Sequence, residues 1–315
     1  MNSPDKVQVS EVALSQIFWQ IDLQVKANLS RVLAALSKHR VGSHHFASVS
    51  GYGHEDLGRA TLDRVFADVM QAEAAAVSVQ LVSGTHAIAC ASFGVLRPGD
   101  ELLAVAGPPY DTLEEVIGLR GNHQGSLKEF GVTYCELPLT IDASVDWKSL
   151  EQAIKPKTRM VLIQRSCGYS WRRSLTIAEI ERIVQVVKQQ NSQTVCFVDN
   201  CYGEFVETCE PTAVGVDLMA GSLIKNPGGT IATTGGYLAG REDLVEMALC
   251  RLTAPGIGSS GGASLNQNRL LFQGLFLAPQ MVGEAMKGNA LIAHTFAQLG
   301  YAVNPPPAAR QRDVI

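Results

Sequence analysis

The chain has 315 residues, of which 46% are hydrophobic, 18% charged and 6% aromatic, and its formal net charge is −4. This length can bury a sizeable core in one large domain or two ordinary ones, and the composition excludes disordered, collagen-like and disulfide-scaffold proteins. Lys and Arg are scattered rather than gathered in a stripe, and no apolar run reaches about eighteen residues. We therefore expect no nucleic-acid partner and no membrane partner.

The N-terminus and the cysteines indicate the compartment. Met1–Lys6 is polar and lacks the apolar core of a signal peptide, so we expect a soluble, cytoplasmic protein. The seven cysteines include no C-x-x-C pair, which argues against a disulfide framework. Three have apolar neighbours and are expected to pack as small hydrophobic side chains: Cys90, Cys135 and Cys196. Neither Cys201 with Cys209 nor the adjacent His44-His45 pair has the spacing of a metal site, so we expect no metal.

The first part of the chain, to about Ser50, predicts two helical pieces. Apolar residues recur there at spacings of three and four, as on one buried helix face: Leu14, Ile17, Ile21, Val25 and Leu29. A loop over Gly51-Tyr52-Gly53-His54 follows, and the next helix is predicted over about Asp56–Ala72.

After this helix, short apolar strands alternate with helices, and turns that contain Gly or Pro separate them. Seven strands are predicted: Val77–Val82, Glu101–Val105, Val132–Leu137, Met160–Gln164, Val195–Val198, Leu218–Ser222 and Gly236–Ala239. Helical patterns lie between several of them: Ala87–Phe93, Thr112–Leu119 and Ile177–Gln190. Nearly continuous apolar strands that alternate with helices argue for an α/β fold, with a mainly parallel sheet covered on both faces.

After Pro255 the pattern changes. Gly256–Gly262 predicts an interdomain hinge or an active-site loop, and a long helix follows to about Leu299. Strands are expected to start at Gly300–Asn304 and at Asp313–Ile315, which suggests a truncated C-terminal domain. We thus divide the chain into an N-terminal helical segment (1–50), a large domain (51–255), and a loop, helix and truncated domain (256–315).

Lys225 is the sharpest chemical feature, because it directly follows an apolar strand inside the Gly/Pro-rich turn Gly221–Gly229. A partly buried amine loses hydration, so its pKa is expected to fall and the amine to become nucleophilic. The alternative is a solvated lysine in a surface turn.

Asp199 ends the buried strand Val195–Val198 and is followed by Asn200–Phe205. A carboxylate at the carboxyl edge of a parallel strand lies where such sheets bind ligands. A helix cap or turn former is the alternative.

Two further strand ends carry weaker signals. Ser83-Gly84-Thr85 opens a small-residue helix, where glycine and free N–H groups favour a phosphate. Tyr110, in Gly107-Pro108-Pro109-Tyr110, places an aromatic ring at the next sheet edge, and a packing tyrosine is the alternative.

The phosphate turn, the tyrosine, the carboxylate and the lysine follow one another along the chain in an order that resembles the fold-type I enzymes that use pyridoxal 5′-phosphate (PLP). Within them it resembles the cystathionine-lyase-like group known as aluminium-resistance or methionine gamma-lyase family proteins, over about residues 34–315. The motifs that carry the resemblance are 51–59, 83–88, 107–113, 164–166, 168–171, 198–205 and 222–229. It implies a three-layer αβα large domain followed by a smaller C-terminal domain.

The resemblance also implies residue roles. Lys225 would hold PLP as a Schiff base and then act as the proton-transfer base. Asp199 would keep the pyridine nitrogen protonated, and Tyr110 would stack on the ring. Ser83, the backbone amides of Gly84 and Thr85, and the Ser222 hydroxyl would hold the phosphate. Tyr52 would reach the phosphate of a neighbouring subunit, which implies a homodimer or homotetramer with shared active sites.

Several positions depart from the family pattern. Tyr52 is followed by Gly53-His54 where better-known lyases have a Tyr-x-Arg pair, and Ile224 stands where Ser or Thr usually precedes the lysine. The phosphate cup must therefore differ in detail. Cys167 replaces an arginine of nearer relatives.

The arginine that grips the substrate carboxylate is not identified by the pattern. Arg165, at a strand end, is the candidate active-site cation, and a structural ion pair is its alternative. Arg310 and Arg312 match no family position and are expected to be solvated charges.

The function implied is a PLP-dependent carbon–sulfur lyase that acts on a small sulfur-containing amino acid by β- or γ-elimination through an external aldimine. No motif reports the second proton abstraction that separates the two reactions. The alternatives are γ-replacement or transamination on the same scaffold, or a catalytically silent paralog. No acidic cluster that would bind aluminium is present.

Overall fold

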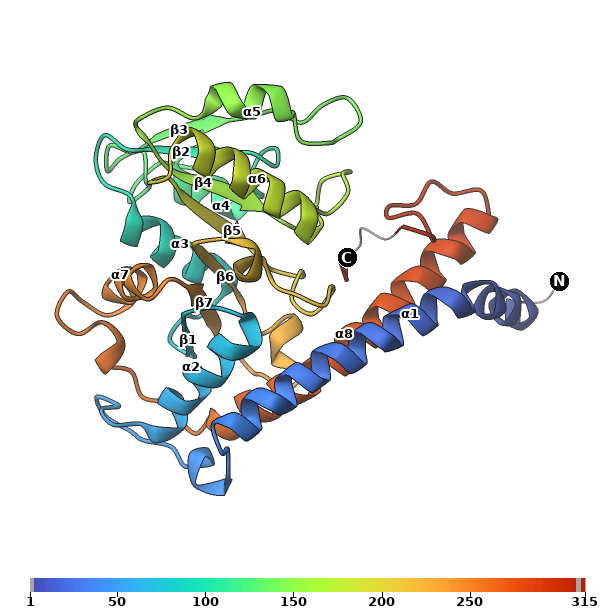
Figure 1. The fold of residues 1–315 in the computed structure, drawn as a ribbon, viewed down its shortest axis with the longest axis horizontal. Coiled ribbons are helices and arrows are strands. Elements are labelled where there is room, and N and C mark those ends of the chain that lie inside the picture. The colour runs from blue at the N-terminus through green and yellow to red at the C-terminus, as the bar shows by residue number, and fades with distance from the viewer. Residues whose placement is uncertain (1–2, 310–312, 315) are drawn as a thin grey trace.

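The computed structural model describes residues 3–309, 313 and 314, and its centre is a seven-stranded sheet in the order β1-β7-β6-β5-β4-β2-β3 (Figure 1). Strands β2 to β6 are parallel, and β7 runs antiparallel to both β6 and β1. The strands are β1 (Ala74–Ser78), β2 (Glu101–Ala104), β3 (Thr133–Glu136), β4 (Thr158–Gln164), β5 (Val195–Asp199), β6 (Leu218–Ser222) and β7 (Gly236–Gly240). Six of the seven predicted strands and the mainly parallel sheet are confirmed, and the first strand lies earlier in the chain than predicted.

The first strand is shifted from its prediction. β1 ends at Ser78 rather than continuing to Val82, because the chain turns there and the Gln80 N–H donates to Ser78 Oγ at 3.1 Å. The seventh strand, β7, agrees with its prediction to within one residue.

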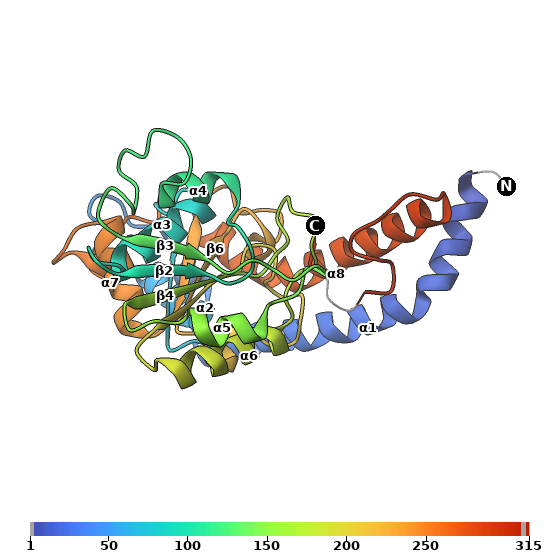
Figure 2. The same cartoon turned by 90° about the horizontal axis from the view of Figure 1, so that it is seen from above.

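Helices cover both faces of the sheet, which gives three layers (Figure 2). One face carries α3 (Gly84–Val95), α4 (Asp111–Ile117) and α7 (Glu242–Leu252). The other carries α2 (Leu57–Met70), α5 (Trp147–Ala153) and α6 (Ile177–Gln190). Helices α5 and α7 were not predicted from the sequence.

The central strands are apolar throughout because both of their faces are buried. Along β5, Cys196 and Val198 belong to the core under α2 and α6, whereas Val195 and Phe197 belong to the core under α3 and α7. Successive side chains of a strand point to opposite faces, so one run of apolar residues serves two cores.

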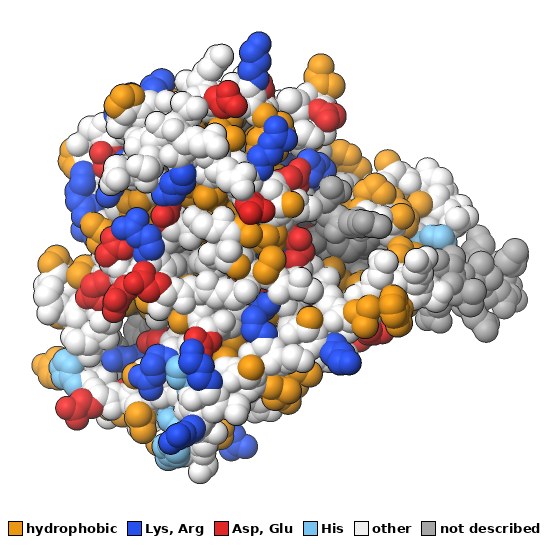
Figure 3. All heavy atoms as spheres, viewed as in Figure 1, with side chains coloured by type: hydrophobic (Ala, Val, Ile, Leu, Met, Phe, Trp, Pro, Cys, Tyr) orange, Lys and Arg blue, Asp and Glu red, His pale blue; other side chains and the backbone are white. Residues whose placement is uncertain are grey.

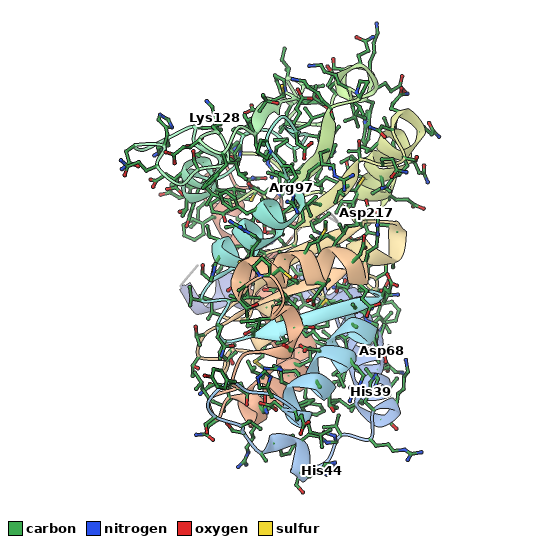
Figure 4. All side chains as sticks on the ribbon, turned by 90° about the vertical axis from the view of Figure 1, so that its left-hand side faces the viewer. His39, His44, Asp68, Arg97, Lys128 and Asp217 are labelled. Carbon is green, nitrogen blue, oxygen red and sulfur yellow. The ribbon has the colours of Figure 1, made fainter. Side chains whose placement is uncertain are left out.

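Two long helices form an arm that projects from the sheet (Figures 1 and 2). The stretch to Ser50, predicted as two helical pieces, contains α1 (Ser3–Lys38) and the short 3-10 helix Ser43–Phe46. α1 lies beside α8 (Asn268–Gln298), the long helix that was predicted. Gly283 of α8 permits the close approach, since a Cβ there would lie 2.2 Å from Val25 Cγ2. At the other end of the arm His39 Nε2 lies 2.8 Å from Asp68 Oδ2 of α2 (Figure 4). Lys38 Nζ lies 2.8 Å from Oδ1 of the same carboxylate.

The C-terminal predictions of new strands were wrong for the described residues. Gly300–Asn304 is irregular, and Asn304 Nδ2 donates to Arg172 O at 2.8 Å. Pro305-Pro306-Pro307 supplies no N–H groups for a ladder. Asp313 and Val314 are also irregular. The described residues do not include Met1, Asn2, Arg310, Arg312 or Ile315, so the predictions made for these positions lie outside them. The division into three segments stays a prediction.

Short 3-10 helices complete the described chain: Ser43–Phe46, Pro211–Val214, Asn226–Gly228 and Gly258–Ser260. On the face drawn in Figure 3, basic and acidic side chains are interspersed. Across the described residues, no helix is long and apolar enough to cross a membrane.

Candidate active site

A cavity of about 260 Å³ opens at the carboxyl edge of β4, β5 and β6, beside the first turn of α3. Its walls bring together seven of the residues singled out in the sequence: Ser83, Gly84, Thr85, Tyr110, Asp199, Ser222 and Lys225. Further lining residues come from the start of α4, the end of β4 and the loops after β4 and β5: Asp111, Thr112, Gln164, Ser166, Gly168, Tyr169, Cys201 and Tyr202. Ile224 completes the wall.

Lys225 leaves the end of β6 just before the 3-10 turn Asn226–Gly228. Its Nζ lies 3.9 Å from the centroid of the Tyr202 ring. Burial pulls the pKa of Lys225 down, but the nearby acidic groups, Cys201, Tyr202 and Asp199 first, raise it by more. These surroundings therefore raise the pKa of Lys225, whereas burial alone had predicted a fall.

Asp199 is the last residue of β5 and only 3% exposed. Its Oδ1 accepts a hydrogen bond from the Cys201 N–H at 3.1 Å, so the carboxyl also shapes the turn that follows the strand. Burial raises the pKa of Asp199, and the Cys201 N–H and the Lys225 charge oppose that rise. A cation bound beside it would favour its charged form.

The turn into α3 forms a cup of small residues. Ser83 caps the helix, and its Oγ accepts from the His86 N–H at 3.1 Å, which leaves the N–H groups of Gly84 and Thr85 at the helix start. A Cβ on Gly84 would lie 2.9 Å from Cys201 Sγ and 3.2 Å from Ser222 Cβ. The cup therefore requires glycine at this position.

Tyr110 is fixed at both ends. Its hydroxyl lies 2.8 Å from Thr85 Oγ1, and its N–H donates to Gln164 Oε1 at 3.2 Å. Burial, with the Asp199 charge beside it, raises the pKa of Tyr110, so the phenol stays protonated at neutral pH. The ring is thus held on the cavity wall by groups from α3 and β4.

Arg165 does not line the cavity. Its guanidinium is buried and donates to Asn200 Oδ1 (3.0 Å), Gly203 O (2.7 Å) and Glu207 Oε1 (2.9 Å). These contacts favour the structural ion pair, which was the alternative to an active-site cation.

Tyr52 is also apart from the cavity. Its side chain is 83% exposed, and it lines a separate hollow formed with the loop over Gly256–Gly262. The loop is tied to it by a hydrogen bond from the Gly262 N–H to Tyr52 O at 2.9 Å.

The chain segment after Asp199 is clamped from behind by polar side chains of α1, which the apolar helix pattern did not predict. Asn28 Nδ2 donates to Phe205 O (2.8 Å) and Glu207 O (3.1 Å), and Gln24 Nε2 donates to Phe205 O (3.0 Å). Arg31 pairs with Glu210 at 3.3 Å. These contacts hold the loop that carries Asp199, Cys201 and Tyr202.

Glu204 lies in the same loop and is fully buried. Its Oε1 accepts from the Tyr237 hydroxyl at 2.7 Å, and its backbone O accepts from Asn226 Nδ2 at 2.9 Å, next to Lys225. Burial raises the pKa of Glu204 to about 8, against the opposing hydrogen bond from Tyr237. Glu204 thus joins β7 to the lysine turn.

The sequence reasoning missed Tyr202 as a site residue. It comes three positions after Asp199 and has a φ of +67°, which is rare for an aromatic residue. Its place in the segment 198–205 was visible in the sequence, but the direction of its ring depends on this backbone conformation. Among the described residues no cluster of three or more His, Cys, Asp or Glu could hold a metal ion.

The profile of the methionine gamma-lyase family matches residues 4–315. The chain belongs to the methionine gamma-lyase family. The uncharacterized protein YnbB of Bacillus subtilis (strain 168) is 49% identical over 306 residues, which are 97% of this chain and 73% of that protein. Membership of the family confirms the resemblance read from the motifs.

Solved structures of this family and of more distant proteins agree with the fold. A carbon-sulfur lyase involved in aluminum resistance from Clostridium novyi NT matches with a TM-score of 0.95 at 44% identity, over 98% of this chain and 74% of that chain. The pyridoxal-5′-phosphate-dependent protein YhfS from Escherichia coli matches with a TM-score of 0.66 at 17% identity, over 89% of this chain and 70% of that chain. The predicted three-layer fold of type I PLP enzymes is confirmed.

Proposed function

We propose that the protein is a PLP-dependent carbon–sulfur lyase, which cleaves the C–S bond of a sulfur-containing amino acid by β- or γ-elimination. One observation carries the proposal: Lys225 and Asp199 face the same cavity as the α3 cup around Gly84. A reactive amine, a buried carboxyl and an anion-binding turn are the three groups that PLP requires. The relative from Clostridium novyi, named a carbon-sulfur lyase, supports the reaction class.

The residues present fit the cofactor. The N–H groups of Gly84 and Thr85 and the Ser222 hydroxyl would bind its phosphate, and the absence of a side chain at Gly84 leaves the room that an anion needs. Asp199 would bind the pyridine nitrogen, and Tyr110 would lie against the ring. Lys225 would hold the aldehyde carbon. When bound, PLP supplies an electron sink that stabilises negative charge on the α-carbon of the substrate.

The side chains of the chain itself divide the remaining work. Lys225 Nζ, as a neutral amine, would be the base that takes the α-proton of the substrate, because it lines the cavity in which the substrate would bind. Asp199 would keep the ring nitrogen protonated, because a buried carboxylate without a cation beside it is costly. Tyr110, fixed by Thr85 and Gln164, would support the ring.

The proposal includes a homodimer or homotetramer in which Tyr52 reaches the phosphate of a neighbouring subunit. Two features support it: the Tyr52 side chain is 83% exposed, and Lys225 is the one basic residue among the described residues that line the cavity. A dianionic phosphate beside a single ammonium is better balanced with a donor from a second copy. Sedimentation velocity tests the assembly, and a monomer at micromolar concentration would contradict it.

The test is an absorbance spectrum of the purified protein with PLP, together with thiol and ketoacid release from methionine and from cystathionine. The wild type is expected to show a visible band of the lysine adduct and to release both products. Lys225→Ala should lose the band and at least about 10³-fold in turnover. Lys128→Ala, an exposed lysine away from the cavity, is the matched control and should change neither.

Two results would contradict the proposal. A folded wild-type protein that shows no band has no PLP chemistry at this site. A band that survives in Lys225→Ala assigns the cofactor to another lysine.

A further inference from the structure

Tyr202 places an aromatic ring against the reactive amine. The ring centroid lies 3.9 Å from Lys225 Nζ, inside the range of about 6 Å over which a cation is attracted to a ring face. Within the described residues, Lys225 Nζ forms no hydrogen bond and no ion pair. The ring face is therefore the direct partner of the ammonium.

The backbone at Tyr202, which directs the ring toward Lys225, has an unfavourable conformation. Its φ of +67° falls in the left-handed region, which bulky residues avoid. The turn is closed by the Gly203 N–H, which donates to Asn200 O at 2.8 Å, and Asn200 is in turn fixed by Arg165 at 3.0 Å. Such outliers persist only where the surroundings enforce them, and they gather at functional sites.

The charge state of Lys225 agrees with this contact. The acidic surroundings raise the pKa of Lys225 although burial opposes them, so the group that faces the ring is an ammonium ion. The ring face carries the negative part of the aromatic quadrupole and stabilises this ion without neutralising it. A carboxylate in the same place would instead form an ion pair that a ligand must break.

We propose that Tyr202 is a catalytic residue whose ring face holds the Lys225 ammonium on the cavity wall, both before the cofactor binds and after Lys225 has taken the α-proton. This inference rests on the proposed function of Lys225. It assigns to Tyr202 a task that needs the ring but not the hydroxyl.

The test compares two substitutions. Tyr202→Phe keeps the ring, whereas Tyr202→Asn removes it with a residue that tolerates a positive φ. Proteins with ¹³Cε-labelled lysine and no PLP are titrated by NMR, and the Lys225 signal is assigned by its loss in Lys225→Met. Tyr202→Asn is expected to increase the acid dissociation constant of Lys225 roughly three- to tenfold, because the ammonium loses its partner. Tyr202→Phe should leave that constant unchanged.

Turnover gives a second readout. Tyr202→Asn should lower kcat about tenfold, and Tyr202→Phe should keep the wild-type value. Tyr301→Asn, at an exposed tyrosine that does not line the cavity, is the matched control. The proposal is overturned if Tyr202→Asn leaves the titration of Lys225 unchanged, or if Tyr202→Phe shifts it as far as Tyr202→Asn does. If Tyr202→Asn does not fold, Tyr202→Gly replaces it. A wild type without turnover defeats the proposed lyase function, and the titration still decides the ring contact.

Discussion

Two basic side chains at the same edge of the sheet have opposite surroundings. Arg165 follows β4, is buried, and has its guanidinium bonded to Asn200, Gly203 and Glu207. Lys225 follows β6 and faces the cavity and the Tyr202 ring. The position of a cation at a strand end therefore does not make it a site residue. The difference is that the protein satisfies the hydrogen bonds of Arg165 and leaves those of Lys225 to a ligand.

The largest expected effect on stability comes from two single variants, in which Arg165 or Lys225 is replaced by methionine. Arg165→Met should lower the free energy of unfolding by about 3–5 kcal/mol, because it takes a partner from the buried Glu210 carboxylate and from the partly exposed Glu207 carboxylate. Lys225→Met should lower it by less than about 1 kcal/mol, since a partly solvated ammonium on a ring face is replaced by an apolar chain. Urea unfolding measures both.

The contrast between Arg165 and Lys225 is contradicted if the two stability losses have the opposite order. A Lys225→Met protein that is less stable than Arg165→Met would mean that the lysine, rather than the arginine, is the structural ion.

The second prediction concerns Glu204, whose neighbours in the chain and in space contact Arg165 on one side and the Lys225 turn on the other. Its pKa is raised by burial to about 8, so the folded protein binds a proton that the unfolded chain, with an ordinary Glu, releases above about pH 4.5. Stability is therefore expected to fall by a few kcal/mol as the pH rises from about 4.5 to 8. Glu204→Gln keeps an acceptor for the Tyr237 hydroxyl and should remove this part of the decline.

The measurement is the melting temperature of the wild type and of Glu204→Gln between pH 5 and pH 8.5. The melting temperature of Glu204→Gln should rise relative to that of the wild type as the pH rises. Two parallel curves would show that Glu204 is ionised in the folded protein.

A smaller effect is expected at the phosphate cup. Gly84→Ala would place a Cβ 2.9 Å from Cys201 Sγ, so the affinity for PLP should fall about tenfold with little loss of stability. Gly288→Ala is the matched control, because a Cβ there meets no atom within 4 Å inside α8. It should leave PLP affinity unchanged and stabilise the protein by up to about 1 kcal/mol. Fluorescence titration with PLP measures the affinities, and equal affinities of the two variants would refute the role of the cup.

The sequence was most informative where one short-range pattern decides the structure. Buried strands such as β5 and β6 are apolar runs with Gly or polar residues at their ends. Helix α6 agrees with its prediction at both ends, and the Thr176 capping box fixes its start. The order of the strand ends then brought Lys225 and Asp199 to one edge, since parallel strands finish on the same side.

Side-chain direction was harder to predict. Gln164 lines the cavity, and adjacent side chains on a strand point to opposite faces, so Arg165 points away from it. This alternation was available in the sequence, whereas the positive φ of Tyr202 was not, because it depends on contacts of the loop with α1 and β6. The apolar spacing predicted the buried face of α1, whereas the contacts of its polar residues were not predicted: Gln24 and Asn28 bind backbone oxygens of the loop, and Arg31 pairs with the Glu210 carboxylate.

The same clamp has a consequence for the order in which the protein is made. α1 leaves the ribosome before the sheet and holds the loop after β5, yet its packing partner α8 begins about 230 residues after α1 ends. At about 5–20 residues per second that delay is roughly 10–50 s. A nascent chain in this interval has its strands but lacks the second helix of the arm, so the loop that carries Asp199 and Tyr202 settles only late in synthesis.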